Sequence, residues 1–219
     1  MSAITTKREY KAARRADASG SGPTLEERPP ARFPGAAAKF ALFGEVLQTG
    51  LLIALVGILV ITLPAALAAG IRHLRRYLHA EASPMTDFWR DVRRALPGGL
   101  VAGLIGAVAA AILVLDVNLA GSGLLPGGAL IAVVGWAGLV VGAVALLVAA
   151  GAWTPERGWR AAVRSVPLVI RADLRGALFL AATAGFVGVA TWMLVPLIVP
   201  ALGCAALAVV AVPERRRAR

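Results

Sequence analysis

The sequence predicts an all-α, polytopic bundle of transmembrane helices, and three observations support this prediction. Apolar residues make up 58% of the chain and the mean hydropathy is +0.76, whereas a soluble domain is about 45–50% apolar. Charged residues make up 16%, and a soluble protein could not cover such an apolar excess with polar surface. The charges are also segregated, because residues 47–70, 100–115 and 178–212 include none. That is the pattern of lipid-buried spans between wet loops.

Residues 1–39 are predicted to form a disordered, basic cytoplasmic arm. They are polar and rich in helix breakers such as Pro29-Pro30, and so have little apolar surface to bury. They lack an apolar segment followed by a small-residue cleavage site, so we predict no signal peptide. Residues 6–16 include five basic side chains and could form a short helix on an anionic membrane surface, but a solvated tail is the simpler interpretation.

The first apolar segment, residues 40–71, is too long for one simple span and short for two full ones. Pro64 interrupts it, and proline both removes an intrahelical hydrogen bond and disfavours helix in the residue before it. We therefore predict that the chain crosses the membrane before Pro64 and returns after it. A single helix kinked at Pro64 is the alternative.

Further apolar segments follow at residues 98–116, 128–153 and 177–212. The first two are each predicted to be one span. The third is interrupted by Pro196 and Pro200, so two short spans joined by a tight turn fit it best. Pro64, Pro196 and Pro200 are therefore the predicted helix breaks of a transmembrane domain that extends over residues 40–213.

Loop charge predicts the topology, because lysine and arginine mark the cytoplasmic side. These residues number eight in 1–39, six in 72–96, five in 152–177 and four after Val212, with none in 117–127 or 194–200. Both termini, including the basic tail of residues 214–219, are therefore predicted to be cytoplasmic, which requires six membrane segments. If Pro64 only kinks one helix, five segments and an external arm follow. Arginine outnumbers lysine 20 to 3, which indicates a GC-rich bacterial genome and hence a bacterial cytoplasmic (plasma) membrane.

Residues 84–96 and 157–166 are predicted to form two basic amphipathic helices at the cytoplasmic interface. The residues expected to lie at this interface or to dock a partner are Trp89, Arg90, Arg93, Arg94, Trp159, Arg160 and Arg164. Each stretch has a Trp-Arg pair followed by an arginine and a proline, at an offset of 70 residues. This similarity would fit an internal duplication, although convergence on one interfacial design explains it more simply.

Three polar residues are predicted to lie in or near the spans. Glu45 and Gln48 are one turn apart near the start of the first span, and Asp116 ends the segment 98–116. A carboxylate at the bilayer centre costs about 2.5–3.5 kcal/mol, so central ones usually serve a function. We expect Glu45 and Asp116 to lie near span ends, where interfacial water solvates them. An ion or substrate site is the alternative.

Several kinds of chemistry find no support in the sequence. His73 and His79 are the two histidines, and no acids stand near them at metal-ligand spacing. Cys204 is the one cysteine, which excludes an intramolecular disulfide and a cysteine-based metal cluster. The sequence contains no phosphate-binding P-loop and no nucleophile elbow. The net charge of +11 comes from basic residues that flank apolar spans, so positive-inside orientation explains it better than nucleic-acid binding. We therefore predict no enzyme, no cofactor and no nucleic-acid partner.

A family resemblance adds to this interpretation. Leu63-Pro64, the alanine-rich residues 65–69 closed by the basic residues 72–76, Asp87-Phe88-Trp89 and a span ending at Asp116 resemble the YesL-like family of small bacterial membrane proteins. That family is defined by a domain of unknown function. The similarity covers about residues 40–118, and the chain departs from it by its long basic arm and its alanine-rich, aromatic-poor later spans. The resemblance implies an accessory role in carbohydrate uptake or utilisation, and no catalytic residues.

Two functional hypotheses follow. The first is a non-enzymatic accessory protein in the lipid bilayer that docks a sugar-import complex or another membrane protein through its basic cytoplasmic helices. The alternative is a small transporter or channel, in which the breaks at Pro64 and at Pro196 and Pro200 line a midplane site. Breaks near both ends of the chain favour transport, whereas the scarcity of buried ionisable residues favours docking. Neither the substrate nor the oligomeric state follows from the sequence.

Overall fold

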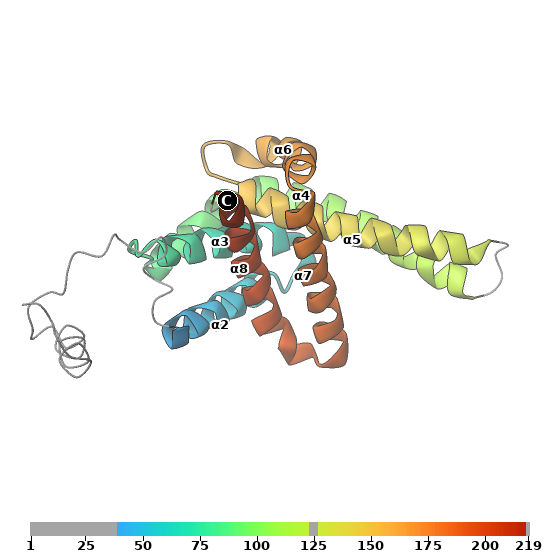
Figure 1. Ribbon diagram of the computed structural model, residues 1–219, viewed down its shortest axis with the longest axis horizontal. Coiled ribbons are helices and arrows are strands. Elements are labelled where there is room, and N and C mark those ends of the chain that lie inside the picture. Colours follow the sequence, from blue (N-terminus) through green and yellow to red (C-terminus); the bar gives the residue numbers. More distant parts are fainter. Residues whose placement is uncertain (1–38, 123–126, 218–219) are drawn as a thin grey trace, which may run out of the picture. The chain divides into compact units, whose positions relative to one another are not determined.

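The computed structural model describes residues 39–122 and 127–217. The predicted arm and residues 123–126 and 218–219 lie outside this part of the chain. The helices are α2 (Lys39–Val56), α3 (Leu63–Leu78), α4 (Met85–Gly121), α5 (Gly128–Ala152), α6 (Gly158–Ala172), α7 (Leu174–Met193) and α8 (Ile198–Arg217), with short 3-10 helices η2 (Val60–Thr62) and η3 (Val195–Leu197) (Figure 1). All regular elements of the described residues are helical, which confirms the predicted all-α class.

Five helical segments are long and apolar enough to cross a membrane. They are Lys39–Val56, Met85–Gly121, Gly128–Ala152, Leu174–Met193 and Val195–Pro213. The other predicted membrane segment corresponds to α3, which has 16 residues and is therefore about 24 Å long, shorter than the roughly 30 Å hydrocarbon core of a bilayer. The chain is a membrane protein with a count of segments in the predicted range of five to six.

The chain reverses direction between α2 and α3. Thr62 stabilises the turn, because its hydroxyl oxygen lies 2.5 Å from the carbonyl oxygen of Val56 and 2.6 Å from that of Leu59, and its single proton is shared between these two acceptors. Pro64 lies in the first turn of α3, where a missing amide proton breaks no intrahelical hydrogen bond. Gly70 of α3 then faces Ile53 of α2. The structure therefore has two antiparallel helices here rather than one helix kinked at Pro64.

Helix α4 is continuous where the sequence predicted a separate interfacial helix followed by a span. It has 37 residues with Pro97 inside it, so it is about 55 Å long. Helix α5 returns beside it, since Gly135 packs near Val117 and Gly138 near Leu113 (Figure 1). The first turns of α4 are thus a rigid extension of a membrane-spanning helix and not an independent element on the lipid surface.

Helix α8, the last helix of the described chain, packs against α2, the first. Pro196 lies in η3, between α7 and α8, and Pro200 lies in the first turn of α8. A Cβ on Gly50 of α2 would overlap the backbone of Val199, and one on Gly203 of α8 would overlap that of Val46. The backbones of α2 and α8 therefore touch, as small residues permit between membrane helices.

The core of the fold lies around α3. Residues 65–69 of α3 are almost completely buried, and Ala69 packs with Leu52, Phe88 and Val92 in one apolar cluster. By contrast, most apolar side chains of α4 beyond Gly103 and of the first half of α5 are exposed. Such a surface on span-length helices is suited to contact with lipid. The helix α3 is therefore the best-packed part of the described chain.

Candidate functional site

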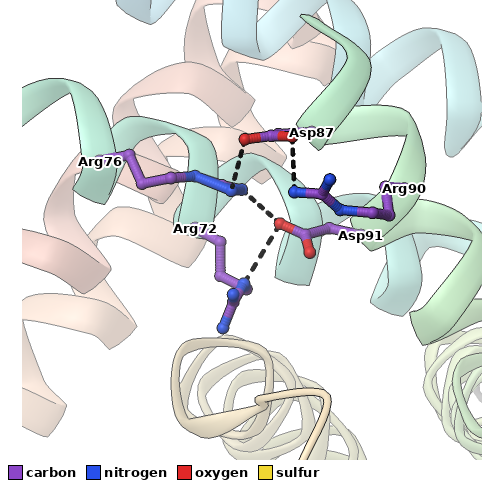
Figure 2. A network of polar contacts seen from close by, with 5 residues as sticks. All are labelled: Arg72, Arg76, Asp87, Arg90 and Asp91. Atoms are coloured by element: carbon purple, nitrogen blue, oxygen red, sulfur yellow. Dashed lines mark hydrogen bonds and ion pairs between the residues drawn. The ribbon is translucent and has the colours of Figure 1, made fainter. Parts of the chain in front are cut away.

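A network of ion pairs joins α3 to the first turns of α4. Asp91 is 2% exposed, and its Oδ2 atom accepts hydrogen bonds from Nε of Arg72, at 3.2 Å, and from Nη2 of Arg76. Asp87 lies 3.8 Å from Arg76 and 2.5 Å from Nη2 of Arg90 (Figure 2). The helix repeat explains this arrangement, because residues four apart lie on one face. Two arginines of α3 thereby meet two aspartates of α4.

The network makes this part of the molecule rigid. A carboxylate that accepts from two guanidinium groups is held by charge-assisted hydrogen bonds, which are shorter and stronger than neutral ones. Since Asp91 is buried, removing its carboxylate would leave the charge of Arg72 uncompensated, whereas removing both arginines would leave the charge of Asp91 uncompensated. The orientation of the first three turns of α4 is therefore fixed by α3.

Aromatic side chains attach α6 and the end of α5 to the same network. The guanidinium of Arg72 lies 5.9 Å from the ring centroid of Trp153, within the range of a cation–π contact. Trp153 packs against Trp159 with ring centroids 6.3 Å apart, and the Trp159 indole donates to the carbonyl oxygen of Ala95 at 2.8 Å. Trp159 is 7% exposed. It therefore packs inside the protein, where the sequence predicted it at the lipid interface.

The outer face of α4 carries a basic groove of about 550 Å³, lined by Thr86, Trp89, Arg90, Arg93 and Arg94. Trp89 is 40% exposed, and its ring meets Phe88 edge-on at 5.5 Å, which holds the indole in place. Arg93 and Arg94 are exposed, and within the described residues neither forms a salt bridge. The structure thus brings together the four predicted docking residues of α4.

The predicted docking residues of α6 lie elsewhere. Arg160 and Arg164 are exposed on α6, whereas Trp159 faces α4. The two Trp-Arg stretches that are 70 residues apart therefore place their tryptophans in opposite environments. Glu156, in the loop before α6, has a lowered pKa, first because its own backbone amide donates to the carboxylate and then because of Thr154, with Arg72 and Arg94 contributing. This carboxylate stays ionised close to the basic surface.

Glu45 has a partner that sequence reasoning missed. Its Oε1 atom lies 2.7 Å from Nε2 of His73, which is 1% exposed. The two residues are 28 positions apart, so only the antiparallel packing of α2 and α3 brings them together. We predicted that interfacial water solvates Glu45, and the structure supplies a histidine instead. Beside this pair, Thr49 is buried, while Gln48 is exposed.

The remaining predicted residues stay apart from these groups. Asp116 is half-buried on α4 and has no salt bridge within residues 39–122 and 127–213. Pro64, Pro196 and Pro200 lie where helices begin or where the chain turns. Among the side chains that the structure describes, no three of His, Cys, Asp and Glu are grouped as metal ligands.

The sequence did not predict Asp91, Asp87, Arg72, Arg76 and His73 as residues of the site. The available signal was the pair of i, i+4 spacings, Arg72 with Arg76 and Asp87 with Asp91, which becomes meaningful only if α3 and α4 pack face to face. Comparisons of the chain with protein-family models, with curated proteins and with solved structures found no match. The resemblance to the YesL-like family therefore stays a prediction.

Proposed function

We propose that this chain is a non-enzymatic accessory protein of the bacterial cytoplasmic membrane that docks an acidic surface of a membrane partner in its basic groove. One observation carries the proposal. The carboxylates at the start of α4 pair with Arg72 and Arg76 of α3, and Asp87 also pairs with Arg90. Arg93 and Arg94 are exposed beside Trp89 and form no salt bridge among the described residues, so they present positive charge to a partner.

The composition of the groove suits a protein partner. Tryptophan and arginine are enriched among the residues that dominate binding energy at interfaces. Rigid positioning lowers the entropy that association costs, and the buried network supplies such rigidity. Complementary charge would speed the encounter with an acidic partner and select against basic ones.

The identity of the partner rests on the resemblance to the YesL-like family. That resemblance points to a sugar-import complex, whose cytoplasmic face would lie beside the groove. The positive-inside distribution of arginine supports a cytoplasmic position for the start of α4. Docking at this position would let a partner bind without any residue of this chain taking part in catalysis.

The test is recovery of partners from native membranes with the tagged full chain. Replacing Arg90, Arg93 and Arg94 by glutamine should strongly reduce recovery, because each charge is worth about 1 kcal/mol near an anionic surface. The matched control replaces Arg157, Arg160 and Arg164, which are exposed on or next to α6, and should retain recovery. Equal losses in both triple variants, with normal expression, would show that overall charge matters and not the groove.

The alternative of a small transporter makes a separate prediction. Proteoliposomes that contain only this protein would then show substrate flux, and neutralising Asp116 in Asp116→Asn would abolish it. We expect no flux that depends on Asp116. This residue is half-buried and lies within about two turns of the end of α4, where the free-energy cost of a charge is lower than at the bilayer centre.

A further inference from the structure

A cavity of about 540 Å³ lies away from the groove, where the end of α5, the second half of α6, the start of α7 and the end of α8 meet. Its wall is mainly apolar and includes the buried side chains of Val148, Leu180, Val209 and Val212. Two charged residues also line it, Arg75 of α3 and Asp173, which lies between α6 and α7. The groove and the cavity share no lining residue.

The size and lining of this cavity point to a hydrocarbon ligand. Ligand sites in proteins measure about 300–1,000 Å³ and are mostly apolar, with a few placed polar groups. A cavity of 540 Å³ in a membrane protein is therefore best filled by an apolar chain.

The mouth of the cavity is apolar as well. Leu168 and Val169 of α6 line the cavity and are exposed, Leu168 to 73%. Leu178 and Phe179 of the adjacent α7 are also exposed, on a helix that is apolar enough to cross the membrane. Exposed apolar side chains therefore lie both in the lining of the cavity and on the start of α7, next in sequence to the lining residue Ala177, where an acyl chain could enter from the bilayer.

The charged residues suit a polar headgroup at one edge. The guanidinium of Arg75 donates to the carbonyl oxygen of Gly151 at 3.1 Å, and arginine is a common protein donor to phosphate. Asp173 accepts from the amide of Gly176 at 2.9 Å, which caps α7 and fixes the carboxylate. A cation and an anion in the lining of one cavity match the phosphate and ammonium groups of a zwitterionic headgroup.

We propose that this cavity binds one acyl chain of a membrane phospholipid, with the headgroup at the edge formed by Arg75 and Asp173. The lipid would fill the space between α6 and the helices α5, α7 and α8, and so hold α6 on the bundle. This inference is independent of the docking groove. If the lipid proposal proved wrong, the docking proposal would be unaffected, and the reverse also holds.

The experiment uses the full chain in nanodiscs of phosphatidylethanolamine and phosphatidylglycerol that contain a phospholipid with a photoreactive acyl chain. Peptide mapping after illumination should find label on the peptides that include Leu180 and Val209. In Ala177→Phe, a ring enters the cavity and displaces several methylene groups. We expect this label to fall about tenfold, equivalent to about 1.4 kcal/mol of binding free energy.

The matched control is Ala182→Phe, on the exposed side of the same helix, which should keep the label. A second filling variant, Ala152→Phe, approaches from α5 and serves if Ala177→Phe does not fold. Unchanged label in a folded filling variant would overturn the proposal, as would equal label in the cavity and on exposed apolar residues. A second labelling experiment uses a free fatty acid with the same photoreactive chain in place of the phospholipid. If the fatty acid labels the cavity and the phospholipid does not, the proposal that the ligand is a phospholipid is wrong.

Discussion

The Oδ2 atom of Asp91 lies 3.2 Å from Nε of Arg72, so that α3 and α4 are joined by a carboxylate that is almost completely buried. The same oxygen also accepts from Arg76. This contact links the reversal of the chain at Pro64 to the position of the basic groove, because α3 is the element that holds the first turns of α4. Loss of the contact should therefore affect both stability and docking.

Asp91→Asn should lower the free energy of unfolding by about 3 kcal/mol, because it leaves the partly buried Arg72 without a carboxylate and Arg76 with only the more distant Asp87. Thermal unfolding of the purified protein in detergent measures the change. Asp116→Asn is the control, since Asp116 has no salt bridge among the described residues, and should stay within about 0.5 kcal/mol of the native chain. A similar loss in both variants would contradict the assigned role of Asp91.

The contact between Glu45 and His73 should appear as an energetic coupling. Alanine at either position should destabilise the chain, and the double variant should lose less than the sum of the two. Contacting residues usually couple by about 0.5–3 kcal/mol. The measurement is a double-mutant cycle by thermal unfolding. The control is a second double-mutant cycle, in which alanine substitutions are made at the exposed Gln48 and at His73. In this control the two losses of stability should add. Additivity in the first cycle would mean that the two side chains do not interact.

The crossing of α2 and α8 should be sensitive to a single methyl group. Gly50→Ala places its Cβ against the backbone of Val199, which cannot move aside as a side chain can, so we expect a loss of about 1–3 kcal/mol from overpacking. Gly142→Ala is matched to it, because no atom lies within 4 Å of its added Cβ. The higher helix propensity of alanine should leave that variant neutral or up to about 1 kcal/mol more stable. Equal melting temperatures would contradict this packing.

The two predicted interfacial tryptophans should behave differently in fluorescence quenching. Trp89 is exposed, whereas Trp159 is buried with its indole bonded to Ala95. Difference spectra between the native chain and each Trp→Phe variant should show that a shallow lipid-borne quencher reaches Trp89 and not Trp159. Trp159→Phe should also cost about 1 kcal/mol, because it removes the buried hydrogen bond from the indole to the Ala95 carbonyl. Strong quenching of Trp159 would place α6 away from α4.

Topology reporters test the orientation that the loop charges predict. Fusions after residue 39 and after residue 219 should both report a cytoplasmic position, and a fusion after residue 122 should report the outside. Two cytoplasmic ends require that the short helix α3 brings the chain back across the membrane. A reporter that is external at residue 39 would show that α3 stays on one side and that five segments cross.

The helical class, the approximate number of membrane helices and their apolar character could be inferred from local sequence, whereas the continuity of α4 over 37 residues could not. Apolar length, the absence of charge and the position of proline act on the residues next to them, so the reversal near Pro64 and the turn at Pro196 were predictable. The residues of the groove were predictable too, since Trp89, Arg90, Arg93 and Arg94 are neighbours on one helix.

Contacts between distant segments were not available from the sequence. An amphipathic helix shows the same periodicity whether its apolar side meets lipid or protein, so Trp159 was predicted at the interface and lies inside. The same ambiguity concealed the partners of Asp91 and Glu45, which depend on the packing of α3 against α4 and α2. A charge flanking a span is solvated in one tertiary arrangement and buried in an ion pair in another, because its environment is set by whichever helix packs over it.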